Sequence, residues 1–138
     1  MIGKCVLLGT LGVLSRADIR TRELPVLYLI LSGMLGTGIY IWKQPFSVWS
    51  LLGGMGVGVS LLMCSVFSRE SIGKGDGYLF CVTGIFLGFR ENLILLIISL
   101  MMCAVGALVL LTVKRCGRKF QMPFIPFVLA ADVLLLCR

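Results

Sequence analysis

The sequence predicts an all-α integral membrane protein, a bundle of about six transmembrane helices that forms a single membrane-embedded domain over residues 1–138. Three observations lead to this fold class. Hydrophobic residues make up 59% of the chain and charged residues only 14%, with a mean hydropathy of +1.06. A soluble domain is about 45–50% apolar and about 25% charged. The apolar residues also fall into six runs with short polar or glycine- and proline-containing stretches between them.

The first three helices follow from these runs in order. The first is expected over 2–19: a basic residue and an apolar stretch imitate a signal peptide, but further membrane sequence follows instead of a cleavage site and a polar domain. The second is expected over 25–42, with Pro25 tolerated at its first turn. The third is expected over 46–67. Aromatic residues bracket the turn between the second and third helices, as they do at a bilayer boundary: Tyr40, Trp42 and Trp49.

The last three helices are separated by two polar stretches. The fourth is expected over 71–89, residues 90–92 form a short turn, and the fifth covers 93–113. A basic loop leads to the sixth, which runs from Met122 to Cys137. The glycines of the third and fourth helices are assigned to close helix packing: Gly53, Gly54, Gly56, Gly58, Gly84 and Gly88.

The charges orient the chain. A net charge of +7 would suggest nucleic-acid binding in a soluble protein, but here we expect the lipid bilayer as a partner and no nucleic acid. Nine of the 13 basic residues lie in the first, third and fifth loops, namely Arg16, Arg20, Arg22, Arg69, Lys74, Lys114, Arg115, Arg118 and Lys119. The positive-inside rule then places these loops in the cytoplasm and both termini outside.

Two aspartates lie at matching places in this pattern. Asp18 closes the first helix and Asp76 opens the fourth, so both belong to the cytoplasmic side. Crossing the hydrocarbon takes about 20 residues, and the apolar runs 2–14 and 77–89 are shorter than that. Extending these helices makes them long enough and draws each aspartate into the membrane boundary. An acid there is costly and is therefore a functional candidate.

A pair of carboxylates at one depth indicates aspartic-protease chemistry. Two close carboxylates share a proton, so that one acts as base on a water and the other as acid. The chain contains no histidine, and this chemistry needs neither histidine nor metal, so no cofactor is expected. Gly73 and Gly75 would allow irregular backbone beside a water-filled cavity. The structural alternatives are that Asp18 pairs with Arg22 on a helix and that Asp76 caps a helix N-terminus.

Three motifs resemble those of the type IV prepilin peptidases. The stretch 18–25, an aspartate with a proline seven residues later, looks like the first aspartate motif of that family. Gly73-Lys-Gly-Asp76 is similar to its GxGD motif. Pro123-Phe-Ile-Pro-Phe127 resembles the stretch that opens its last span, and the chain has Tyr78 where the family usually has a lysine. The motifs occur in family order and the resemblance covers nearly the whole chain.

The resemblance implies a membrane aspartyl endopeptidase that trims the short basic leader from prepilins or pseudopilins of a type IV pilus or secretion system. Asp18 and Asp76 would be the catalytic pair, in the inner membrane and facing the cytoplasm. The supporting motif residues would be Gly73, Gly75, Pro25, Pro123 and Pro126. Because the sequence begins directly at its first span, it looks like the short, peptidase-only form.

Other readings stay open from the sequence. A small ion-conducting subunit would use Asp18, Asp76 and Asp132 as an ion path, and a non-catalytic assembly factor would keep the fold without the activity. For Asp132 itself, a pairing or snorkelling role near Arg138 is expected rather than catalysis. Glu23 and Glu70 are interpreted either as solvated loop acids or as acids that meet the basic leader. The six cysteines lack CxxC spacing, and those within apolar runs are interpreted as buried apolar thiols. Cys116 lies in the basic loop and is assigned no role.

Overall fold

The computed structural model describes residues 2–21, 25–43, 47–68, 73–114 and 122–138, and within these ranges the regular structure is entirely helical. The elements in chain order are α1 (Ile2–Thr21), α2 (Val26–Lys43), α3 (Val48–Phe67), α4 (Lys74–Lys114) and α5 (Ile125–Cys137). Three of them, α2, α3 and α4, are long and apolar enough to cross a membrane, and α5 is a shorter apolar helix. The all-helical membrane fold class expected from the sequence is therefore confirmed.

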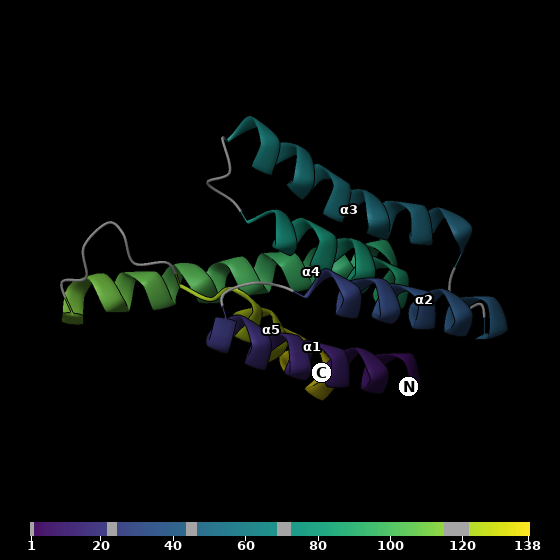
Figure 1. Cartoon of the computed structure of the whole chain (residues 1–138), viewed down its shortest axis with the longest axis horizontal. Helices are drawn as coiled ribbons and strands as arrows, with labels where there is room; N and C mark the ends of the chain where they lie inside the picture. Colours follow the sequence, from purple (N-terminus) through teal and green to yellow (C-terminus); the bar gives the residue numbers. More distant parts are fainter. Residues whose placement is uncertain (1, 22–24, 44–46, 69–72, 115–121) are drawn as a thin grey trace.

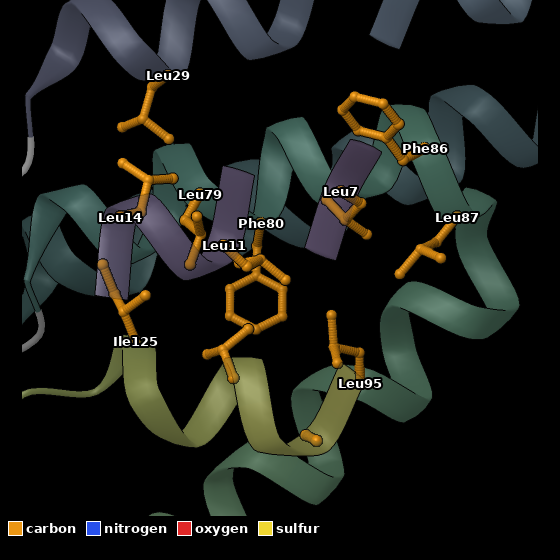
Figure 2. Packing of buried hydrophobic residues seen from close by; sticks show 12 residues of the cluster. Leu7, Leu11, Leu14, Leu29, Leu79, Phe80, Phe86, Leu87, Leu95 and Ile125 are labelled. Atoms are coloured by element: carbon orange, nitrogen blue, oxygen red, sulfur yellow. The ribbon is translucent and has the colours of Figure 1, made fainter. Parts of the chain in front are cut away.

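The core lies where α1, α4 and α5 meet. Leu7, Leu11 and Leu14 recur at helical spacing along α1 and are almost completely buried, because residues three or four apart share one face of a helix. They pack against α4 and against Ile125 of α5 (Figure 2). Phe80 of α4 is fully buried in the same cluster. This cluster holds α1 and α5 side by side and thereby positions the C-terminal end of α1 beside the N-terminus of α5.

Glycines join α3 to the first part of α4, as the sequence indicated. A Cβ built on Gly54 would lie 2.7 Å from the carbonyl oxygen of Gly84, and one built on Gly58 would collide with the backbone of Cys81. These helices therefore touch backbone to backbone, which only small residues permit. Gly56 is different, because a Cβ there meets nothing within 4 Å. Its assignment to packing is wrong.

The chain reverses at Gly88, inside the element α4. This glycine has φ 75° and ψ −177°, a conformation that other residues rarely adopt, and it divides α4 into two helices. The sequence analysis assigned Gly88 to packing and placed the turn at Arg90-Glu91-Asn92. Residues 90–92 are instead helical. The polar side chains there were misleading, since they follow the turn rather than form it.

Asn92 holds the reversal together from inside. Its side chain is fully buried, and its Nδ2 donates hydrogen bonds to the carbonyl oxygens of Gly54 (2.9 Å) and Phe80 (3.0 Å). The hydroxyl of Thr83 donates to Asn92 Oδ1 over 2.7 Å. One amide therefore ties both parts of α4 to α3, in a setting where an unsatisfied polar group would be costly.

Figure 1 shows the resulting arrangement. The helices α1, α2, α3 and the two parts of α4 run along the long axis of the molecule in alternating directions. The C-terminal ends of α1, α3 and α4 consequently lie toward one end, and the Gly88 reversal lies toward the other. Asp18 and Asp76 belong to the first of these ends.

Candidate active site

Asp18 lies in the last turn of α1, at the edge of the core. Leu14, one turn earlier, is buried and Arg20 is exposed, so the helix passes from the core to the surface over these residues. Asp18, which follows Leu14 and precedes Arg20 on this helix, has a half-buried side chain. A carboxylate is thus held at the boundary of the apolar region by a helix whose other end is anchored in the core.

Asp76 lies in the first turn of α4 and is also half-buried. Its backbone N–H donates to the carbonyl oxygen of Gly73 over 3.1 Å, which closes the first turn of the helix. A Cβ built on Gly73 would lie 3.3 Å from Asp76 Oδ2, tighter than most real Cβ contacts. The glycine therefore leaves space directly beside the carboxylate.

The two carboxylates come from helices distant in sequence and lie close enough to act on each other. Asp18 exerts an electrostatic effect on Asp76, although the two residues are 58 residues apart in the sequence. Like charges that face each other in a medium of low dielectric constant cannot both ionise cheaply. The pair can therefore hold a single proton between its two members, as an acid–base dyad requires.

The N-terminus of α5 completes the site. The backbone N–H of Ile125 hydrogen-bonds to the Asp18 carboxyl group. Pro126 follows in the first turn of the helix and has no N–H to offer, so Ile125 presents a donor where its neighbour cannot. A carboxylate near a helix N-terminus is also favoured by the helix dipole. The proline-rich motif thus supplies a donor that orients one of the two acids.

Two residues near Asp76 were missed by the sequence analysis. Gly77 is buried against α3, where an added Cβ would lie 2.5 Å from Cγ of Leu62. Cys103, in the second part of α4, lies within electrostatic range of Asp76. The only signal for Gly77 was a third glycine in Gly73-Lys-Gly-Asp-Gly77. Cys103 carried no signal at all, because its proximity to Asp76 depends on the reversal at Gly88.

The remaining motif residues have local structural roles. The carbonyl of Pro25 accepts the N–H of Tyr28 (2.9 Å) at the start of α2. Pro123 directly precedes Phe124, the N-cap residue of α5. Gly75 is helical, in the first turn of α4, so the expectation of irregular backbone at this position is wrong. Among the described glycines, only Gly88 has a positive φ.

Asp132 lies away from the dyad. It is 1% exposed, and its Oδ2 has no hydrogen-bond partner within the described part of the chain. The charges that act on it belong to Lys4 and Glu91, whose side chains form an ion pair of 2.8 Å. The expected role beside Arg138, pairing or snorkelling, is therefore wrong, because α5 packs along α1 and turns Asp132 inward.

The other candidates give no second centre in the part of the chain that the structure describes. Glu23 and Glu70 lie outside the described residues. Across the described ranges, no three His, Cys, Asp or Glu side chains group closely enough to hold a metal ion. The dyad with the α5 N-terminus is the site that these observations single out.

Comparison with known proteins supplies the family. The sequence model of the type IV leader peptidase family matches residues 5–108, which include both aspartates but not the stretch 123–127. No curated protein and no solved structure matches the chain. The match extends over three quarters of the 138 residues. The chain therefore belongs to the type IV leader peptidase family.

Proposed function

We propose that this protein is a membrane aspartyl endopeptidase that removes the short basic leader from type IV prepilins or prepilin-like proteins, with Asp18 and Asp76 as its catalytic pair. The observation that carries the proposal is the convergence of these two half-buried carboxylates with the N-terminus of α5, in a chain of the leader peptidase family. Membership of the family implies a peptidase. The substrate and the roles of the residues are our proposals.

The chemistry assigns a different role to each acid. Burial disfavours the charge of both acids, but at Asp18 the backbone N–H of Ile125 opposes this effect and at Asp76 the neighbouring carboxylate adds to it, so we assign Asp18 as the ionised member. It takes a proton from a water, and the water oxygen bonds to the carbonyl carbon of the scissile peptide. Asp76 gives its proton to the carbonyl oxygen. When the C–N bond breaks, the departing nitrogen takes the proton from Asp18, and a hydroxyl of the tetrahedral intermediate returns its proton to Asp76 as the new carboxyl group forms. The two acids again share one proton.

The proposed setting is a bundle of six membrane crossings that forms one domain over 1–138. The two parts of α4 on either side of Gly88 supply two crossings, and α1 and α5 supply the outer ones. Exposed Arg16 and Arg20 lie at the end of the molecule that carries the dyad, as expected for a cytoplasmic face. The protein would thus cut in the inner membrane on the cytoplasmic side, with both of its own termini outside.

Leader cleavage by aspartate variants tests the proposal. Asp18→Asn and Asp76→Asn should each abolish cleavage of a prepilin in membranes, because one carboxylate cannot be both acid and base. Both proteins should remain in the membrane and melt like wild type in detergent. Asp132→Asn is the matched control, since it removes a buried acid whose electrostatic partners are Lys4 and Glu91 and not the dyad, and it should retain cleavage. Processing at the wild-type rate by either dyad variant would contradict the proposal.

The same assay separates the two rival functions. A non-catalytic assembly factor would leave the prepilin uncut even as wild type. An ion-conducting subunit would carry current across liposomes that depends on Asp18, Asp76 and Asp132 together. The dyad acids lie at one end of the molecule, and Asp132 interacts with Lys4 near the opposite end of α1, which favours a localised reaction over a path of acids.

A further inference from the structure

A second polar site lies at the end of the molecule opposite the dyad. Lys4 is 14 residues from Asp18 on α1, which corresponds to about 21 Å along a helix. Around it is a cavity of about 210 Å³ between α1, α2 and the end of the first part of α4. Its lining includes the polar side chains of Lys4, Lys43, Tyr40 and Glu91 and the apolar side chains of Ile39 and Phe86.

The charges of this cavity are mixed. Lys4 and Glu91 form an ion pair of 2.8 Å, and both side chains remain more than a third exposed. Lys43, at the end of α2, lines the same cavity and has no ion pair with any described residue. Asp132 lies within electrostatic range of Lys4 and Glu91 but does not line the cavity. A ligand here meets two ammonium groups and one carboxylate, which suits a zwitterion better than a simple anion.

The cavity adjoins an apolar strip on the surface of α2. Ile39 lines the cavity and also belongs to this shallow strip, which includes Leu31, Leu35 and Trp42. A polar cavity beside an apolar helix face has the polarity pattern of a phospholipid site.

The position of the cavity relative to the bilayer agrees with this pattern. Trp42 and Trp49 lie at the same end of the molecule and are 85% and 82% exposed. Tryptophans are enriched where the hydrocarbon meets the headgroups. The cavity between Lys4 and Lys43 is therefore at headgroup depth, and the apolar strip of α2 extends from it toward the hydrocarbon.

From this arrangement we infer that the cavity binds the headgroup of a phospholipid with a primary amine, such as phosphatidylethanolamine. The two lysines receive the phosphate, the carboxylate of Glu91 accepts hydrogen bonds from the lipid ammonium, and one acyl chain lies along the apolar strip of α2. A quaternary ammonium, as in phosphatidylcholine, cannot donate those hydrogen bonds. This inference is independent of the proposed peptidase activity.

The test is the thermal stabilisation of the delipidated full-length protein by short-chain lipids in detergent. Phosphatidylethanolamine should half-saturate the stabilisation at a concentration about tenfold lower than phosphatidylcholine, the scale of one hydrogen bond to a charged group. Glu91→Gln should remove this difference. Glycerophosphoethanolamine, which has no acyl chains, should give no shift at the concentration where the lipid saturates.

A matched pair of glycine variants tests the location without removing a charge. Gly3 lines the cavity, and a Cβ there meets only ordinary contacts at 3.8 Å, so a leucine at this position fills the cavity. Gly9, on the same helix, is exposed with nothing within 4 Å. Gly3→Leu should weaken stabilisation by phosphatidylethanolamine at least as much as Glu91→Gln does, and Gly9→Leu should leave it unchanged.

Several results would overturn the inference. Equal stabilisation of wild type by the ethanolamine and choline lipids would remove the role of Glu91. Equal stabilisation by phosphatidylglycerol would mean that the site takes any anionic lipid. A shift with glycerophosphoethanolamine alone would make it a site for a soluble phosphate. An unchanged response in Gly3→Leu would place lipid binding elsewhere, and this variant decides even if Glu91→Gln does not fold.

Discussion

At the scale of single residues, the position of the Asp76 carboxylate depends on Gly73, a neighbour that has no side chain. Gly73 has no Cβ, and the position that a Cβ would take is 3.3 Å from Asp76 Oδ2. Gly73 lies outside the helix and is exposed, so it has little packing to lose. A methyl group at this position would therefore act on the carboxylate and not on the stability of the fold.

The first residue-scale prediction follows from that contact. Gly73→Ala should lower the rate of leader cleavage by about tenfold or more, because small misplacements of a catalytic group are costly, while the melting temperature stays at the wild-type value. Gly38→Ala is the control, since a Cβ at that exposed helical position meets nothing within 4 Å. Equal rates in the two variants would mean that the space beside Asp76 is not needed.

A second residue-scale prediction concerns the thiol of Cys103, which lies within electrostatic range of Asp76. A membrane-permeant maleimide that reacts with this thiol adds bulk next to the dyad, so labelling should inactivate wild type. Cys103→Ala should cut at nearly the wild-type rate and keep its activity after the same treatment. Equal inactivation of the variant would assign the effect to another cysteine and would place Cys103 away from the substrate.

At the scale of secondary-structure elements, the sequence predicted the bounds of most helices but misplaced the turn between the two parts of α4. The apolar runs located α1, α2 and α3 to within a few residues, because long hydrophobic stretches have few alternatives in a membrane. The reversal in α4 was misplaced from Gly88 to residues 90–92. The error arose because Asn92 was interpreted as a turn residue, whereas it is buried and bonds to backbone carbonyls. The sequence alone does not distinguish the two cases.

The contact between α3 and α4 gives the element-scale prediction. Gly54→Ala should lower the melting temperature by roughly 5–10 °C, because the methyl group meets the backbone of Gly84 at 2.7 Å and overpacking costs about 1–3 kcal/mol. Gly56→Ala, two residues along the same helix, faces open space and should cause no loss. Similar melting temperatures for the two variants would show that α3 and α4 are not in backbone contact.

At the scale of the whole molecule, the candidate site was predictable only in part. Its two acids could be paired from the sequence because the loop charges and helix count put both on one side. The hydrogen bond of Ile125 to Asp18 and the proximity of Cys103 to Asp76 could not be predicted, since both depend on how α5 and the second part of α4 pack against the rest. Which residues of different helices lie close together is determined by helix packing, and a hydropathy pattern carries no information about that packing.

The number of membrane crossings gives the whole-molecule prediction. If α4 crosses once, its 41 residues carry the chain from one side to the other, and Phe67 and Lys114 lie on opposite sides. If it crosses twice, with the reversal at Gly88, both lie on the same side. We expect two crossings, because a helix of about 20 residues already spans the hydrocarbon and each part of α4 packs within the same bundle.

Fusions of a cytoplasmic fluorescent protein or an exported phosphatase, joined after successive helices, measure this directly. Junctions after Thr21, Phe67 and Lys114 should be fluorescent, and those after Lys43 and Arg138 should have phosphatase activity. Thr21 follows Asp18 at the end of α1, and Phe67 precedes Asp76 at the end of α3. The fusions at these two residues therefore also report whether the dyad faces the cytoplasm. Phosphatase activity after Lys114 together with fluorescence after Phe67 would mean a single crossing by α4. That outcome would separate the second part of α4 from the dyad and remove Cys103 from the proposed site.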